Sequence, residues 1–312
     1  MRRTIGKTEW VRRLLTAIER EHWSKVLIVA LLLLALYVYN GFHRSTGVPL
    51  YGEGMPDISR SAVVHYINVG QADAACIVLP GGEVLLIDAG ANASEPQLLA
   101  YLERYGISRI DCLVLTHPHE DHIGGADAVL EAYDVKSVLL TSAEATSTTY
   151  DHLLTCIEDE GSVVYIASPG DRYTFGEASF SVLGPHGDTW ESLNNASIVL
   201  RFDFGDTSFL FTGDAESEEE AAVLSYDIKS VSADVLKVAH HGSQTSTTRA
   251  FLDAVAPRIA VISCGTYNEY GHPHDSVIDS LTAHTSHILR TDQHGSIRIY
   301  TDGERLWAQG DS

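Results

Sequence analysis

The chain has 312 residues, 45% of them hydrophobic and 8% aromatic, and four cysteines, so it can bury a sizeable core and is neither mainly disordered nor a disulfide scaffold. The formal net charge is −21; residues 1–25 hold seven basic and three acidic side chains and carry +4, which leaves −25 for the rest. Because so acidic a body repels phosphate backbones, we expect no stable nucleic-acid binding from charge, although a nuclease whose metal ions neutralise the phosphate locally is not excluded.

An uncharged apolar run follows the basic segment 1–25. Residues 26–39 read VLIVALLLLALYVY, and the flanking residues up to Phe42 bring the run near the ~20 residues that span a bilayer. A buried core helix and a cleaved signal peptide are the alternatives, but the preceding positive charge disfavours the first and the lack of an Ala-x-Ala site the second. We therefore expect a single-pass signal anchor at 26–42, the body outside the cell membrane, and a Gly- and Pro-rich linker at 43–61.

Residues 62–312 alternate short apolar runs with glycines and helical patterns, as a domain of mixed sheets and helices does. Both halves are rich in strands and carry helices, which predicts an α/β fold with two sheets covered by helices, a four-layer αββα sandwich tethered by the transmembrane helix. Strands are expected at 62–69, 75–79, 83–90, 110–117, 136–141, 162–167, 179–184, 197–205, 207–214, 234–240, 258–265, 286–291 and 296–301, and helices at 94–106, from 121, at 150–160, 216–226, 248–255 and 276–284.

The motif THPHEDHIGG carries the strongest chemical signal. His117 and His119 leave the end of a predicted strand two residues apart, so their side chains can project the same way. Asp121 and His122 then begin a helix, and four nitrogen and oxygen ligands in six residues can serve two metal ions. The glycines at 124–125 permit close backbone packing beneath them. A run of surface histidines is the alternative, and this spacing disfavours it.

Three other predicted strand ends supply possible partners. Asp214 ends FLFTGD, and one Asp can bridge two metals through its two oxygens. His240, His241 and Ser243 lie in VAHHGS, and His272 lies in YGHPH. Each motif alone is weak, because a Gly-Asp pair often marks only a turn and HHGS can be a polar loop. Their occurrence in this order after the histidine-rich motif is much more specific.

These stretches together resemble metallo-β-lactamase-fold hydrolases and, more narrowly, the hydrolase domain of the competence protein ComEC/Rec2 and its stand-alone relatives. The resemblance covers about residues 62–302, in INVGQADA, LLIDAG, LTHPHEDHIGG, NNASIVL, FLFTGDAE, DVLKVAHHGS and SCGTYNEYGHPH. It implies the αββα fold, metal-dependent hydrolysis and two divalent metal ions, zinc or manganese.

The resemblance also implies roles by position. Asp121 would orient the nucleophile, and His241 and His240 would face the substrate and stabilise developing charge. The metal ligands would be His117 and His119 for the first ion, Asp121 and His122 for the second, Asp214 between them and His272 completing the second site. Asp88 and Asp73 would support the ligands from behind, and Ser243, Asn195 and Glu216 would lie on the substrate side; Ser243 can equally cap a helix, and Glu216 suits a helix N-terminus.

Some positions depart from the family pattern. Asn195 stands where many members have a metal-binding histidine. An amide oxygen is a harder ligand than imidazole, so this change makes manganese plausible beside zinc at the first site. His186 is an alternative source of the missing ligand. Asn68 and Ala72 replace the usual Asp and Gly of the first motif.

The sequence therefore predicts a membrane-anchored binuclear metal-dependent hydrolase that cleaves phosphodiester bonds, of the nuclease or phosphodiesterase type, with a small-molecule or phosphodiester substrate as its partner. A carboxylic ester, lactone or thioester hydrolase on the same metals is the second hypothesis, because a shared fold does not fix the substrate. A non-catalytic surface binding module is the third, and the intact ligand set argues against it.

Overall fold

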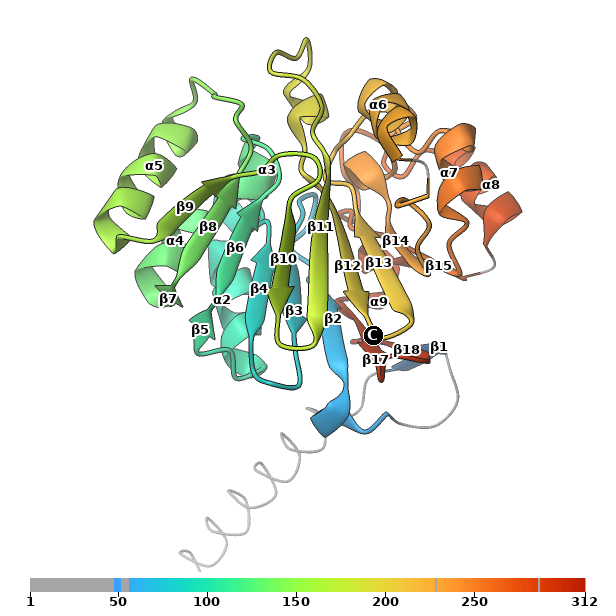
Figure 1. Ribbon diagram of the computed structural model, residues 1–312, viewed down its shortest axis with the longest axis horizontal. Coiled ribbons are helices and arrows are strands. Elements are labelled where there is room, and N and C mark those ends of the chain that lie inside the picture. The colour runs from blue at the N-terminus through green and yellow to red at the C-terminus, as the bar shows by residue number, and fades with distance from the viewer. Residues whose placement is uncertain (1–47, 52–55, 228, 286, 312) are drawn as a thin grey trace, which may run out of the picture. The chain divides into compact units, whose positions relative to one another are not determined.

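The computed structural model describes residues 48–51, 56–227, 229–285 and 287–311, which belong to one unit, Val48–Ser312 (Figure 1). The expected basic segment 1–25 and anchor 26–42 lie outside the described residues. Within the described ranges no helix combines the length and the apolar character needed to cross a bilayer. The prediction of a transmembrane helix as part of the fold is corrected on this finding, and the α/β sandwich remains.

Two large sheets form the centre of the described unit. Each sheet contains four neighbouring strands that run parallel to one another, beside antiparallel strands. The first sheet has the order β1 (Val48–Tyr51), β18 (Leu306–Gly310), β17 (Ile297–Thr301), β2 (Ala62–Tyr66), β3 (Ala75–Val78), β4 (Val84–Ile87), β6 (Cys112–Leu115), β8 (Ser137–Leu140), β9 (Val163–Ile166). The second has the order β10 (Arg172–Phe175), β11 (Ala178–Gly184), β12 (Val199–Phe204), β13 (Thr207–Phe211), β14 (Val235–Lys237), β15 (Ile259–Ile262), β16 (His287–Arg290), and β5 (Arg109–Ile110) pairs with β7 (Asp134–Val135).

Helices cover the outer face of each sheet, as Figure 1 shows. The first sheet packs on α2 (Glu95–Arg104), α3 (Glu120–Ile123), α4 (Ala126–Ala132) and α5 (Thr148–Glu160); the second on α6 (Ser217–Asp227), α7 (Arg249–Val255) and α8 (Asp275–His284). Short helices are α9 (Thr291–His294), η1 (Ile58–Arg60), η2 (Asn92–Ser94), η3 (Leu193–Ala196) and η4 (Ala239–Gly242). One buried apolar cluster lies between the sheets and one under each helical layer, so the four-layer αββα prediction is confirmed.

The amino-terminal edge of the first sheet includes residues that the sequence assigned to a linker. Strand β1, at 48–51, pairs antiparallel with β18, and η1 follows at 58–60. Part of the expected linker 43–61 therefore belongs to the folded unit.

Parallel strands bring their carboxyl ends to one edge of each sheet, where ligand sites of α/β proteins lie. Here those ends belong to β4 and β6 in one sheet and to β13, β14 and β15 in the other. The loops that follow them carry Asp88, the histidine-rich motif, Asp214 and the pair of histidines at 240–241. The topology thus gathers motifs that are far apart in the sequence.

Candidate metal centre

The loop after β6 presents the first two histidines. His117 is 1% exposed, and its Nε2 lies 3.0 Å from Nδ1 of His119, which precedes the first residue of α3. Burial, followed by the charge of His122, lowers the pKa of His117 well below its usual value, and burial also lowers the pKa of His119. Both rings are therefore neutral and offer lone pairs, the state in which imidazole binds metals.

Four further side chains converge beside this pair. Ligand atoms of Asp121, His122, Asp214 and His241 all lie within 4.8 Å of one another. Nε2 of His122 is 3.2 Å from Oδ1 of Asp214, and Nε2 of His241 is 3.2 Å from Oδ2 of Asp121. His122, Asp214 and His241 are buried, whereas the side chain of Asp121 is 34% exposed. Three members of the group are therefore enclosed by protein, and Asp121 is the member that solvent reaches.

The electrostatics of this group fit a divalent cation. Burial opposes ionisation of Asp121, but His122 and the hydrogen bond with His241 outweigh it and lower the pKa of Asp121 to about 2. Burial likewise opposes protonation of His241, but Asp214 and Asp73 raise its pKa to about 10. Within the described residues, Nε2 of His122 and Oδ1 of Asp214 are buried, and neither makes a well-aligned hydrogen bond, although the two atoms lie 3.2 Å apart. Carboxylates that attract positive charge, beside buried ligand atoms without hydrogen bonds, are what a metal site presents.

Asp88 supports the cluster from behind. It follows β4 with a φ of 56°, and its two oxygens accept hydrogen bonds from the backbone N–H and the hydroxyl of Thr116, each at 2.8 Å. Oδ2 also lies 2.8 Å from Nδ1 of His122. A proton held on Nδ1 by this carboxylate leaves Nε2 of His122 free for a metal.

Ser197 is a site residue that the sequence reasoning missed. Its Oγ lies 3.2 Å from Nδ1 of His117 and accepts a hydrogen bond from the backbone N–H of Asp214 at 3.0 Å. Gly213, with a φ of 50°, permits this contact, because a Cβ there would lie 2.9 Å from that Oγ. The sequence signal for Ser197 is its place in NNASIVL, two residues after Asn195.

Asn195 is not directed at the histidine pair. Its Nδ2 donates to Glu218 at 2.7 Å, and its Oδ1 accepts from the backbone N–H of Glu216 at 2.9 Å. Both ends of the amide are therefore used in holding the start of α6. His186 is also occupied elsewhere, since its Nδ1 lies 2.9 Å from Oε1 of Glu219.

His240 lies at the rim of the cluster. Its side chain is 21% exposed, with Nε2 3.7 Å from Asp214 and Nδ1 3.6 Å from Glu216. His240 and His241 have φ values of 50° and 54°, which only a strongly constrained turn imposes on residues other than glycine. Ser243 completes this turn, because its N–H donates to the His240 carbonyl at 2.8 Å and its Oγ lies 3.1 Å from Oγ1 of Thr245.

His272 lies near the cluster but outside the four-residue group. Its ring centroid is 5.6 Å from that of His240 and 6.3 Å from that of His241. Nε2 of Gln71 lies 3.4 Å from Nδ1 of His272, and Oε1 of the same amide accepts from the backbone N–H of Gly265, which fixes its orientation. The structure thus brings His241, rather than His272, to Asp121, His122 and Asp214.

Residues 68–266 match the family model of the metallo-beta-lactamase superfamily. The chain belongs to this superfamily. It is 34% identical to ComE operon protein 3 of Bacillus subtilis (78% of this chain, 33% of that protein) and 32% identical to Recombination protein 2 of Haemophilus influenzae (79% and 30%). It is also 28% identical to exodeoxyribonuclease YycJ of Bacillus anthracis, in a match that covers 39% of this chain and 46% of that protein. The resemblance to the competence-protein family is confirmed, and the chain spans about a third of the length of the first two relatives.

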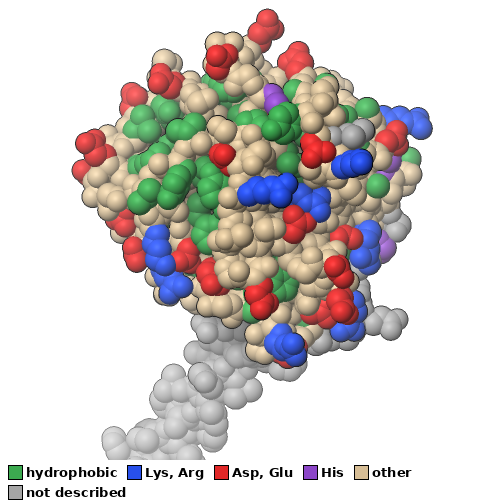
Figure 2. Space-filling model, viewed as in Figure 1, with side chains coloured by type: hydrophobic (Ala, Val, Ile, Leu, Met, Phe, Trp, Pro, Cys, Tyr) green, Lys and Arg blue, Asp and Glu red, His purple; other side chains and the backbone are tan. Residues whose placement is uncertain are grey.

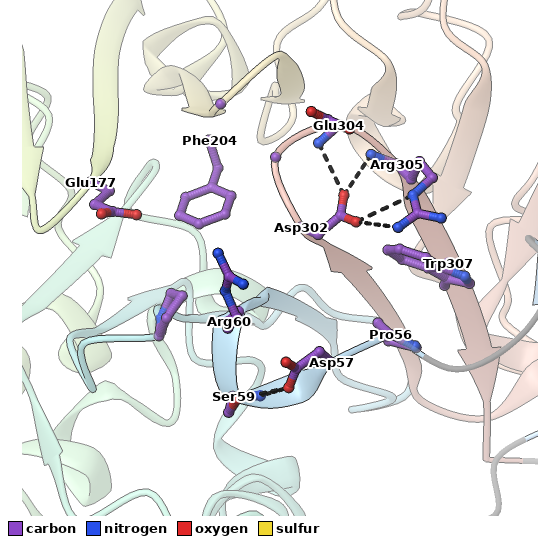
Figure 3. Close-up of a pocket in the computed structure, with 13 residues that line it drawn as sticks. Pro56, Asp57, Ser59, Arg60, Glu177, Phe204, Asp302, Glu304, Arg305 and Trp307 are labelled. Atoms are coloured by element: carbon purple, nitrogen blue, oxygen red, sulfur yellow. Dashed lines mark hydrogen bonds and ion pairs between the residues drawn. The ribbon is translucent and has the colours of Figure 1, made fainter.

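A large cavity elsewhere in the described unit contains none of the side chains that converge at the metal centre. It measures about 790 Å³ and is lined by residues that include Arg60, Phe204, Asp302 and Trp307 (Figure 3). Gly205, also in its wall, precedes β13, whereas Asp214 follows that strand, so the cavity lies at the opposite end of β13. Among the described residues that line this cavity there is no histidine or cysteine, and the groups of converging ligand atoms lie at the metal centre.

Proposed function

We propose that the chain is a binuclear metal-dependent hydrolase that cleaves phosphodiester bonds. The convergence of Asp121, His122, Asp214 and His241, with their ligand atoms within 4.8 Å of one another, carries the proposal. The neighbouring pair His117 and His119 supplies a second position for a metal. The similarity to a protein named as an exodeoxyribonuclease supports a phosphodiester substrate.

The proposed ligands divide between two positions. His117 and His119 would hold the first ion, Asp121 and His122 the second, and Asp214 would lie between them. Two divalent ions bound here would supply a water of lowered pKa and polarise the phosphoryl group. We propose zinc, with manganese as the alternative, since imidazole suits zinc and carboxylates suit manganese.

The chain's own side chains orient the reaction. Asp121, the most exposed member of the group, would accept a hydrogen bond from the attacking water. His240 at the rim can donate to a phosphoryl oxygen as negative charge develops there. Acidic side chains are spread over the face shown in Figure 2, so local cations, and not the surface, would have to attract an anionic substrate.

The geometry changes one assignment made from the sequence. The sequence placed His272 on the second metal and His241 on the substrate side. Because Nε2 of His241 lies 3.2 Å from Asp121 whereas His272 is outside the group, we propose that His241 is the ligand and that His272 faces the substrate.

A metal-replete substrate panel tests the function. Full-length protein loaded with zinc or manganese would be assayed on bis(p-nitrophenyl) phosphate, single-stranded DNA, p-nitrophenyl acetate, a lactone and a thioester, with Asp121→Ala as the matched control. Diester cleavage that requires Asp121 supports the proposal. Turnover of the carboxylic substrates alone would establish the second hypothesis, and two bound metals without any turnover would favour the binding module.

A further inference from the structure

A buried lysine lies behind the proposed metal centre. Lys237, the last residue of β14, is 4% exposed, and its Nζ donates to Oδ2 of Asp73 at 2.6 Å and to the carbonyl of Val238 at 3.1 Å. Asp73, in the loop between β2 and β3, is also 4% exposed. An ammonium group is expensive to bury unless it is paired, so this ion pair explains the placement of both residues. It joins the two sheets beneath the cluster.

The second oxygen of Asp73 faces the imidazole of His241. Oδ1 lies 3.3 Å from Nδ1 of that ring, and the same nitrogen is 3.0 Å from the carbonyl oxygen of Ser263. A carbonyl oxygen can only accept, so Nδ1 keeps its proton, and Nε2, which lies 3.2 Å from Asp121, is the nitrogen that would bind a metal after losing its own proton. Asp73 and Ser263 therefore set the direction of the ring.

Asp73 also belongs to a second set of possible ligands. Its carboxylate, that of Asp88 and the ring of His122 have ligand atoms within 4.8 Å of one another. A carboxylate released from its partner at this place would compete with the four-residue group for a cation. The ammonium of Lys237 occupies one oxygen of Asp73 and repels a cation that approaches it.

Movement of Asp73 would also reach the ligand loop through the backbone. The N–H of Asp73 donates to the carbonyl of Asp121 at 3.1 Å, and the carbonyl of Asp73 accepts from Gly90 at 2.8 Å. The side chain and the backbone of Asp73 thus contact both the His241 turn and the loop of Asp121.

We propose that Lys237 is a positioning residue that holds Asp73 as the support of His241 and keeps this carboxylate from binding the metal. The proposal rests on the metal centre of the proposed function and not on the bond that the enzyme cleaves. It assigns a role to an ion pair whose partners are 164 residues apart.

Cobalt binding to the full-length chain tests the role. Co²⁺ affinity, measured in competition with a chromophoric chelator, and the visible Co²⁺ spectrum would be compared for the wild type, Lys237→Met, Lys237→Arg and the double variant Lys237→Met/Asp73→Asn. We expect Lys237→Met to weaken Co²⁺ binding roughly 10- to 100-fold and to change the spectrum. Lys237→Arg should restore both, and the double variant should recover the spectrum because no carboxylate is left to compete.

Lys136→Met is the control, since Lys136 pairs with Asp111 at the amino-terminal ends of β6 and β8, away from the ligand loops. Wild-type affinity and spectrum in Lys237→Met would overturn the proposal, as would equal changes in Lys136→Met. If Lys237→Met does not fold by circular dichroism, an altered spectrum in Lys237→Arg overturns it. A wild type that binds no Co²⁺ overturns both this inference and the proposed function. The expected Co²⁺ pattern without diester cleavage overturns only the proposed function.

Discussion

Replacing Asp88 with asparagine should weaken metal binding while the fold survives. If the carbonyl oxygen of the new asparagine takes the place of Oδ1, it still accepts the hydrogen bond from the backbone N–H of Thr116. The NH₂ group then takes the place of Oδ2, and it can only donate where the carboxylate oxygen accepted. Nδ1 of His122, 2.8 Å from Oδ2 in the wild type, must then become an acceptor. The proton of the neutral ring moves to Nε2, the atom that faces Asp214 and would bind the metal.

The size of the effect follows from that lost lone pair. Removing the carboxylate behind a ligating histidine costs roughly 10- to 100-fold in metal affinity, or about 1.4–2.7 kcal/mol. Asp88→Ala goes further, because the two Thr116 donors and the His122 ring lose their acceptor. At about 1–3 kcal/mol for each unsatisfied group, the free energy of unfolding should fall by at least about 3 kcal/mol.

Two measurements separate these effects. Competition with a chelator gives the metal affinity, and urea unfolding with chelator present gives the stability of the metal-free protein. Asp111→Asn is the matched control: Asp111 is buried, accepts from the backbone of Val84 at 2.9 Å and lies before β6 instead of after it. Its metal affinity should match that of the wild type. Wild-type metal affinity in Asp88→Asn would refute the tautomer argument.

Protein prepared without chelator should contain two divalent ions per chain, and one ion or none in elemental analysis would reject the binuclear reading. Asp121→Ala should abolish diester turnover with an unchanged circular dichroism spectrum; a variant that keeps most of its rate contradicts the role given to this carboxylate. His241→Ala should lose metal, whereas His272→Ala should keep it and slow turnover by roughly 10²–10³ through a lost donor. The reverse pattern in metal content would restore the assignment made from the sequence.

The position of the site could be predicted because parallel strands align their carboxyl ends. The apolar runs before the histidine-rich motif, Asp214 and the HHGS turn became β6, β13 and β14. A helix expected from Asp121 is α3, Glu120–Ile123, and the glycines at 124–125 do allow close packing, since a Cβ on Gly124 would lie 2.3 Å from the backbone nitrogen of Asn92. The ends of these strands, the start of the helix and the need for the glycines can all be predicted from the pattern of residues within one short segment.

The partners inside the site could not be predicted, because they depend on how the two sheets meet. Nothing near Lys237 in the sequence indicates that it pairs with Asp73, and Ser197 looks like an ordinary strand residue. His241 and His272 both follow parallel strands, so sequence order alone does not say which ring reaches Asp121. The left-handed turn at 240–242 decides it by bending the chain back toward the cluster. The strand at 48–51 was missed because its pairing with β18 is equally long-range.

His65 should make the protein less stable in mild acid. Its ring in β2 is buried, with Nδ1 3.0 Å from the hydroxyl of Tyr101 and the ring packed edge-on against Tyr105. Burial, and then the charge of Arg298, lowers the pKa of His65 from 6.5 to about 3. The folded state keeps the ring neutral while the unfolded chain takes up a proton, so the stabilising contribution is complete above about pH 6.5. It is lost by about 1.4 kcal/mol per pH unit as the pH falls toward 3.

His65→Gln removes this titration, so urea unfolding of both proteins at pH 6.5 and pH 5 isolates it. Chelator would be present throughout, so that metal release in acid does not contribute. Over this interval the wild type should lose about 1.6 kcal/mol more in free energy of unfolding than the variant, because unfolded His65 goes from about half protonated to almost fully protonated while the folded ring stays neutral. His152→Gln, a change at an exposed ring, should follow the wild type. Equal losses in the wild type and His65→Gln would mean that the folded protein accommodates a charged His65, which its surroundings of Tyr101, Tyr105 and Arg298 argue against.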